Sequence, residues 1–292
     1  PRSGGSLPQG FGPGLRALIR NAVDPSRPWQ VLVEEERTAE GEVEPVVVAF
    51  LTGSECPFTC TFCDLWVNTL EGPTPPGAIA HQVENVARDH PGVPHVKLYN
   101  SGNFFDRRAV PPGDVPRVAA ALSDRRSVIV ESHPRLIDER APRFNDALGG
   151  GLQVAMGLET ADPQVLASLD KGMTVDDFSA AARRLDAWGI PSRAFILVRP
   201  PGHDDVQGEA WAKRSIDFAQ DAGVECCVVI PTRGGAPPSL EALEAAAEHG
   251  VGRRRGRVFV DLWDAPSVYG DAPDVRARLA RLERMNLTQQ AP

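Results

Sequence analysis

Short apolar runs rich in valine and isoleucine alternate with amphipathic stretches along most of this 292-residue chain. Several runs are apolar almost throughout, which is typical of strands buried on both faces of a sheet. They lie at 47–54, 95–102, 127–134, 152–160, 192–200, 225–231 and 257–263. Strands that alternate with helices predict a parallel sheet with right-handed crossovers. Six or seven such units favour an α/β fold, a partial or near-complete TIM-like (β/α)6–7 barrel with short terminal extensions.

The stretches between the runs carry helix signals. Thr174 with Asp177 three residues later is typical of a capping box, and Gly189 follows where that helix should end. The barrel is expected to span 46–264, between an N-terminal extension (1–45) and a C-terminal tail (265–292). Within the extension, "WQVLVEEER" and the first barrel strand are predicted to form a hairpin.

Composition limits the classes of function. The net charge is −8 and the pI about 5.3, which argues against broad nucleic-acid binding, since that needs a basic face. The basic cluster "RRRGR" (253–257) is read either as a solvated turn before a strand or as a phosphate or RNA contact. No apolar run approaches the length of a membrane span, so we expect a cytoplasmic protein with no membrane partner.

Cys56, Cys60 and Cys63 fall within eight positions, in the loop after the first barrel strand. In parallel α/β folds the chemistry lies at the carboxyl ends of the strands, where this loop belongs. Thiolates spaced C-x3-C-x2-C can hold three corners of an iron–sulfur cube and leave one iron open. A zinc site is the main alternative, although the loop offers no fourth protein ligand. Inert buried thiols fit poorly with a loop rich in proline and threonine.

With an aromatic residue, Phe62, before the last cysteine, this motif resembles that of the radical S-adenosylmethionine (SAM) enzymes over residues 45–235. The resemblance implies one [4Fe–4S] cluster on the three cysteines and SAM bound at the open iron. It also implies an oxygen-sensitive enzyme that cleaves SAM reductively and abstracts hydrogen through a 5′-deoxyadenosyl radical. An electron donor such as flavodoxin or ferredoxin would supply the electron.

The same resemblance assigns cofactor contacts at the other strand ends. "YNSGNFFD" stands where the family usually has a Gly-Gly-Glu-like turn that grips the SAM amino group, but it has no glutamate. Glutamates that end the next two strands are placed to bond ribose hydroxyls or the SAM amine. An arginine after the fifth strand is placed to pair with the SAM carboxylate. The predicted cofactor-binding residues, besides Phe62, are Ser101, Gly102, Asn103, Glu131, Glu159 and Arg199.

Three stretches, "LYNSGNFFD", "ESHPRLID" and "GLETADPQVLASLDKGMTVDDFSAA", resemble the branch of the Elongator catalytic subunit and the radical SAM subunit of archaeosine synthase. Those relatives act on tRNA bases or tRNA-borne precursors. This acidic sequence, without a large basic module, departs from them. We therefore expect a small-molecule substrate, with tRNA modification as the alternative. A non-catalytic iron–sulfur or zinc protein is the alternative from another class.

Tyr99 and His133, at strand ends, are the candidate catalytic residues, although a hydrogen-bonded structural role is also open for His133. Cys226 and Cys227 are adjacent at the start of a strand, so their side chains should point to opposite faces. We read them as core residues and predict a single cluster.

Overall fold

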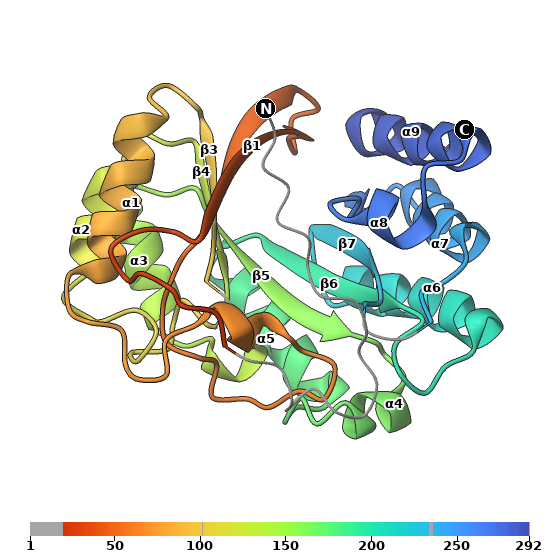
Figure 1. The fold of residues 1–292 in the computed structure, drawn as a ribbon, viewed down its shortest axis with the longest axis horizontal. Helices are drawn as coiled ribbons and strands as arrows, with labels where there is room; N and C mark the ends of the chain where they lie inside the picture. Colours follow the sequence, from red (N-terminus) through yellow and green to blue (C-terminus); the bar gives the residue numbers. More distant parts are fainter. Residues whose placement is uncertain (1–19, 101, 234–235, 292) are drawn as a thin grey trace.

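The computed structural model describes residues 20–100, 102–233 and 236–291, and one curled sheet organises this part of the chain (Figure 1). Its eight strands follow the order β1-β2-β3-β4-β5-β6-β7-β8. The strands are β1 (Gln30–Arg37), β2 (Val43–Phe50), β3 (His95–Tyr99), β4 (Ser127–Glu131), β5 (Leu152–Glu159), β6 (Ser192–Val198), β7 (Cys226–Pro231) and β8 (Arg257–Val260). β1 pairs antiparallel with β2, and each later neighbour is parallel. The predicted hairpin and the partial α/β barrel are confirmed.

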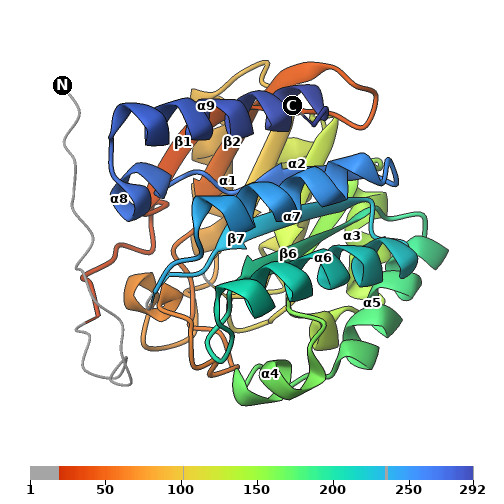
Figure 2. The same cartoon turned by 90° about the vertical axis from the view of Figure 1, so that its right-hand side faces the viewer.

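The described helices are α1 (Ala78–Asp89), α2 (Val115–Leu122), α3 (Arg140–Leu148), α4 (Pro163–Ser168), α5 (Val175–Ala187), α6 (Asp205–Asp221), α7 (Leu240–Gly252), α8 (Ala265–Tyr269) and α9 (Pro273–Thr288). Most of them cover the outer face of the sheet, where α6 and α7 lie side by side (Figure 2). Two short 3-10 helices are η2 (Leu65–Asn68) and η3 (Pro134–Leu136). The predicted capping box of Thr174 and Asp177 begins α5. In the described part of the chain, no helix is both long and apolar enough to cross a membrane.

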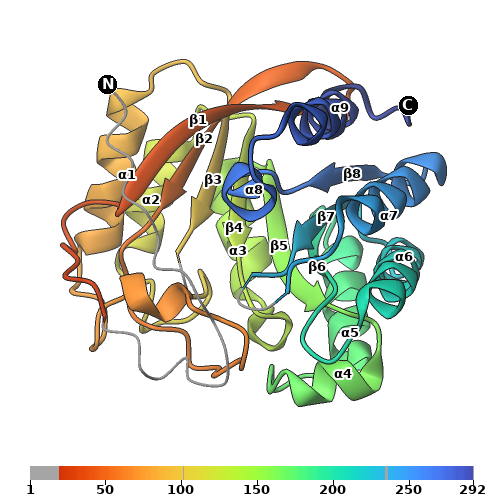
Figure 3. The same ribbon diagram turned by 45° about the vertical axis from the view of Figure 1, so that its right-hand side comes forward.

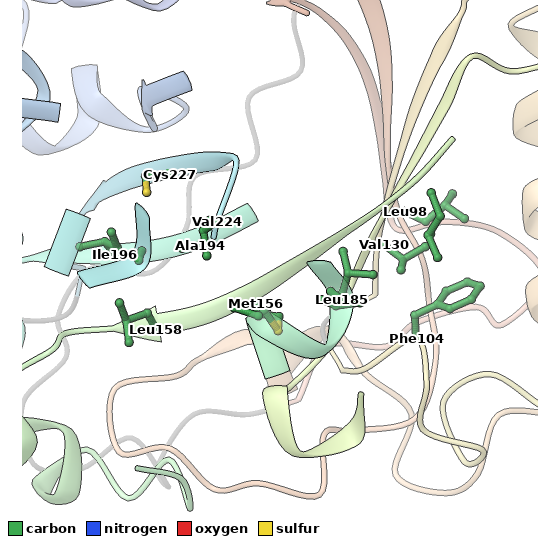
Figure 4. Close-up of a cluster of buried hydrophobic side chains, with 14 of the residues drawn as sticks. Leu98, Phe104, Val130, Met156, Leu158, Leu185, Ala194, Ile196, Val224 and Cys227 are labelled. Carbon is green, nitrogen blue, oxygen red and sulfur yellow. The ribbon is translucent and has the colours of Figure 1, made fainter. Parts of the chain in front are cut away.

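The main core lies between the sheet and these helices. Leu98 of β3 and Val130 of β4 point toward Phe104, and all three are almost fully buried (Figure 4). Burying one such side chain contributes about 1.5–3 kcal/mol. Cys227 joins this core, whereas Cys226 packs in a smaller cluster with Val228 and Phe259. The two thiols thus point to opposite faces of β7, as predicted.

The inner face of the sheet carries a buried ionic network near the amino ends of the parallel strands. Glu36 of β1 is its hub, because its carboxylate lies 2.6 Å from Nη2 of Arg193 and 2.5 Å from Nζ of Lys97. Arg257 of β8 reaches the same carboxylate at 3.7 Å. Arg193 also donates to the side-chain oxygen of Gln153 at 3.1 Å. The network therefore joins strands from opposite sides of the curled sheet.

α9 lies across the gap between β1 and β8 (Figure 3). Gln289, at its carboxyl end, accepts from the N–H of Val258 at 2.7 Å and donates to the Val258 carbonyl at 2.9 Å. Asn286 repeats this pattern on Val260, at 2.8 and 2.9 Å. Two side-chain amides therefore take the place of a neighbouring strand, because they bond the backbone N–H and carbonyl groups along the outer edge of β8.

Candidate active site at the carboxyl ends of the strands

The cysteine segment, residues 56–63, follows β2 and lies in the orange loop beyond the carboxyl ends of the strands (Figure 3). Its three thiols are half-buried and form no disulfide. Burial raises the thiol pKa of Cys60 to about 11 and of Cys63 to about 12, and it raises that of Cys56 as well. These pKa values favour neutral thiols at pH 7 in the cluster-free protein. The thiols become thiolates when a cationic centre binds them.

The turn between α4 and α5, residues 169–172, supports the cysteine segment from the side. The N–H of Thr61 donates to the Leu169 carbonyl at 2.9 Å. Gly172 has a φ of +71°, and a Cβ there would lie 3.3 Å from the ring of Phe58. A glycine at 172 thus allows both the left-handed backbone and the close approach of Phe58.

His133 connects this turn to the segment. Its ring stacks on Phe58, with centroids 3.6 Å apart and planes at 14°. Nε2 lies 3.0 Å from the Lys171 carbonyl, and Nδ1 accepts from the N–H of Arg135 at 3.2 Å, which assigns a neutral ring with the proton on Nε2. Burial lowers the pKa of His133 to about 4, so the ring stays neutral at pH 7. Both ring nitrogens are bound to backbone groups, and the predicted catalytic role stays a prediction.

Asn103 links the loop after β3 to the same centre. Its Nδ2 donates to Sγ of Cys56 at 3.1 Å, and its Oδ1 accepts from the N–H of His133 at 2.6 Å. A Cβ on Gly102 would lie 3.0 Å from the Ser54 carbonyl, so this position favours glycine. Ser101, the third predicted residue of this loop, lies outside the described residues.

Two carboxylates and an ammonium face the cysteine segment from β4, β5 and the 169–172 turn. Nζ of Lys171 lies 2.7 Å from Oε1 of Glu159, and both side chains are buried. Burial raises the pKa of Glu131 to about 7, with the nearby Lys171 opposing and Glu159 reinforcing the shift. Lys171 also lowers the thiol pKa of Cys56 and Cys60, against the larger effect of burial. The ammonium thus lies within electrostatic reach of both glutamates and of the thiols.

Glycine makes room for the pair of Glu159 and Lys171. A Cβ on Gly157 would fall 2.1 Å from Oε1 of Glu159 and 2.7 Å from Nζ of Lys171. The register of β5 against β6 shifts between Gly157 and Glu159, and Glu159 has a φ of +65°. This irregularity turns the glutamate toward the site. Neither the bulge nor the contact with Lys171 could be inferred from spacing, so Lys171 is not among the residues predicted from the sequence.

For the remaining predicted residues, Tyr99, Arg199 and Phe62, the structure gives no contact with Lys171 or the two glutamates. Tyr99 lies on the inner face, edge-on to Phe50 and Phe195 with centroids 6.0 Å away, and burial raises its pKa to about 12. Arg199 has a φ of +61° and donates to the Pro237 carbonyl at 2.9 Å. Phe62 is half-buried within the cysteine segment. Their predicted roles stay predictions.

Comparison with known proteins agrees with this arrangement. The family model described as "Radical SAM superfamily" matches residues 50–212, more than half of the chain. Archaeosine synthase subunit beta of Methanosarcina acetivorans is 25% identical over 58% of this chain and 53% of its own length. The protein of the same name from Thermococcus kodakarensis is 28% identical over 43% of this chain and 40% of its own length. The chain thus spans about half the length of these curated relatives or less.

A solved structure of methylornithine synthase superposes with a TM-score of 0.52 over 81% of this chain and 82% of the other, at 13% identity. This likeness supports the partial-barrel fold alone. The expected branch near archaeosine synthase is confirmed by the two curated relatives. Radical SAM enzymes use a [4Fe–4S] cluster and SAM, and the cysteine segment lies where the fold places such chemistry. The chain is an enzyme of this class and belongs to the radical SAM superfamily.

Proposed function

We propose that Cys56, Cys60 and Cys63 hold one [4Fe–4S] cluster, that SAM binds at its open iron, and that the enzyme abstracts hydrogen from a small-molecule substrate. When bound, the cluster and SAM supply a 5′-deoxyadenosyl radical. The observation that carries the proposal is the convergence of the cysteine segment with Lys171 and two glutamates at the carboxyl ends of the strands.

The donor set fits a cube better than a single ion. Among residues 20–100, 102–233 and 236–291, no three His, Cys, Asp or Glu side chains gather closely enough to hold one metal ion. A cube does not require this, because each thiolate binds a different iron. The amide of Asn103 already donates to the sulfur of Cys56, and hydrogen bonds to cluster sulfurs tune such centres.

The surrounding side chains suit the polar groups of SAM. For the amino group we propose acceptors of the loop after β3, as predicted for Ser101, Gly102 and Asn103, and for the ribose hydroxyls we propose the carboxyl group of Glu131. For the SAM carboxylate we propose Lys171 or Arg199 as the cationic partner, and we favour Lys171 because its charge acts on the thiols of Cys56 and Cys60. We propose His133 as a positioning residue for the cysteine segment, because its ring supports Phe58.

Replacing Lys171 by methionine is expected to weaken SAM binding by about tenfold or more, the usual scale of a lost charge-assisted contact. Binding would be measured by equilibrium titration of SAM into the reconstituted protein. Lys213→Met is the matched control, because Lys213 pairs with Glu209 along α6 on the far side of the sheet. Equal SAM affinity in both variants would contradict the role of Lys171 and favour Arg199.

The proposed activity is tested on anaerobically purified, reconstituted protein with SAM and a strong reductant. Formation of 5′-deoxyadenosine, quantified by mass spectrometry, is expected and should rise when the true substrate is added from metabolite pools. A protein that contains about four iron and four sulfide per chain, yet forms no 5′-deoxyadenosine with any pool, would instead be an electron carrier. One zinc per chain without iron would contradict the cluster.

tRNA modification is the second candidate, because two curated relatives are named archaeosine synthase. The basic cluster at 253–257 gives it little support. Arg253 pairs with Asp217, and Arg255 pairs with Asp221, so these charges are largely compensated within the chain. Tight tRNA binding that weakens steeply with salt, together with tRNA-dependent formation of 5′-deoxyadenosine, would favour this candidate over a small molecule.

The proposal also includes a cytoplasmic location and a donor such as flavodoxin or ferredoxin. All five cysteines are free, which suits a reducing compartment. To compare the two donors, each is added in its reduced form to the reconstituted protein. Reduction of the cluster is then monitored through its visible absorbance.

A further inference from the structure

We infer that Arg20 is a positioning residue that clasps the two ends of the cysteine segment and so holds its thiols ready for the cluster. This inference rests on the proposed cluster. Arg20 precedes β1 by ten positions, outside the part of the chain that matches the family model. Its side chain nevertheless lies against the loop that carries the cysteines.

One end of the clasp lies directly before the first cysteine. Nη2 of Arg20 lies 2.6 Å from Oε2 of Glu55, the residue that precedes Cys56. The Arg20 side chain is 21% exposed and that of Glu55 40% exposed. Partial burial of the guanidinium leaves this pair less screened by solvent than a pair on the open surface.

The other end lies shortly after the last cysteine. Nη1 of Arg20 donates to the carbonyls of Trp66 at 2.7 Å and Thr69 at 3.0 Å, and also to the Thr69 hydroxyl. The guanidinium carbon lies 5.4 Å from the centroid of the Trp66 ring. Thr69 is fully buried, so this end of the clasp is fixed in the fold.

The next residue continues the contact with η2. The N–H of Asn21 donates to the Val67 carbonyl at 2.7 Å, and its side-chain amide donates to Oδ1 of Asn68 at 2.7 Å. The path of the chain is therefore fixed where it presents the Arg20 side chain. A planar guanidinium offers several donors in a fixed fork, so one side chain can serve both ends at once.

A closed loop loses less conformational freedom when its thiols bind a cluster than an open loop does. The other described contacts of the segment come from the 169–172 turn, the stack of Phe58 on His133 and the amide of Asn103, and none of these joins its two ends. Opening the clasp should therefore speed the loss of iron and leave the helices and the sheet in place.

The test compares Arg20→Met and Arg20→Lys with wild type and with Arg27→Met. Arg27 lies in the same segment, but it is exposed and pairs only with Asp24, at 3.6 Å, among the described ion pairs. Each reconstituted protein is exposed anaerobically to an iron chelator, and the decay of its visible absorbance is followed. Arg20→Met is expected to lose iron about tenfold faster, and Arg20→Lys at an intermediate rate, because a lysine keeps the pair with Glu55 alone. Arg27→Met should behave as wild type.

Thermal unfolding of the cluster-free proteins separates a clasp from a general loss of stability. If Arg20→Met loses iron faster than wild type but its cluster-free form melts at a similar temperature, the result supports the clasp. Glu55→Gln, which weakens only one end, should also accelerate iron loss. Iron loss from Arg20→Met at the wild-type rate would overturn the clasp but leave the proposed function intact. A wild-type protein that takes up no iron would instead overturn the proposed function.

Discussion

Replacing Cys60 by alanine is expected to abolish the brown chromophore and the formation of 5′-deoxyadenosine together. Cys60 lies in the middle of the cysteine segment, and its removal leaves two of three thiolates for a cube that already lacks a fourth protein ligand. The measurement is iron and sulfide per chain after reconstitution, with 5′-deoxyadenosine quantified in the same samples.

Cys226→Ala is the matched control for this loss. Cys226 is a fully buried thiol in the small inner cluster with Val228 and Phe259, on a different strand from the one that precedes the site. This variant should keep the cluster and the activity, with only a modest loss of stability. Full colour in Cys60→Ala, or equal loss in both variants, would contradict the assignment of the three thiols.

Replacing Glu36 by glutamine is expected to lower the free energy of unfolding by about 3–5 kcal/mol, the scale found when one partner of a buried ion pair is removed. Arg193, which is 2% exposed, would lose its one carboxylate partner among the described ion pairs, and a buried guanidinium would be left with neutral acceptors alone. Urea titration measures the change. Glu35→Gln is the control, because Glu35 is exposed next to Glu36 on β1 and undergoes the same change in charge. Equal stability of the two variants would contradict the role of the network.

The effect of Glu36 should depend on pH. Despite burial, Arg193 and Lys97 hold the pKa of this carboxyl well below its usual range. A group with a lowered pKa in the folded state stabilises the fold at pH values above its unfolded pKa, about 4.3 for glutamate. The difference between wild type and Glu36→Gln should therefore be largest near neutral pH and shrink as the pH falls below about 4.3. A difference that grows in acid would contradict this explanation.

The strands and the chemistry were predictable because each rests on local pattern. Apolar runs of valine and isoleucine marked the strands, and the C-x3-C-x2-C spacing marked the loop that we propose to hold the cluster. Lys171 was not predicted as a site residue. Its contact with Glu159 depends on a bulge in β5 that turns the glutamate toward it and on the absence of a side chain at Gly157. Glu36 looked like one of three consecutive strand glutamates until the curl of the sheet brought Lys97 and Arg193 to it. Contacts of this kind depend on tertiary structure, which periodicity does not encode.

A sheet that does not close on itself has two free edges, and each is a template to which a foreign strand could add. The two amides of α9, Asn286 and Gln289, already occupy the hydrogen-bonding groups of β8. On the opposite edge, β1 carries Glu34, Glu35 and Glu36 in a row. Charged side chains on an edge strand discourage strand addition between molecules. The acidic strand and the amide-bearing helix thus let this half-open barrel remain open without becoming a seed for aggregation.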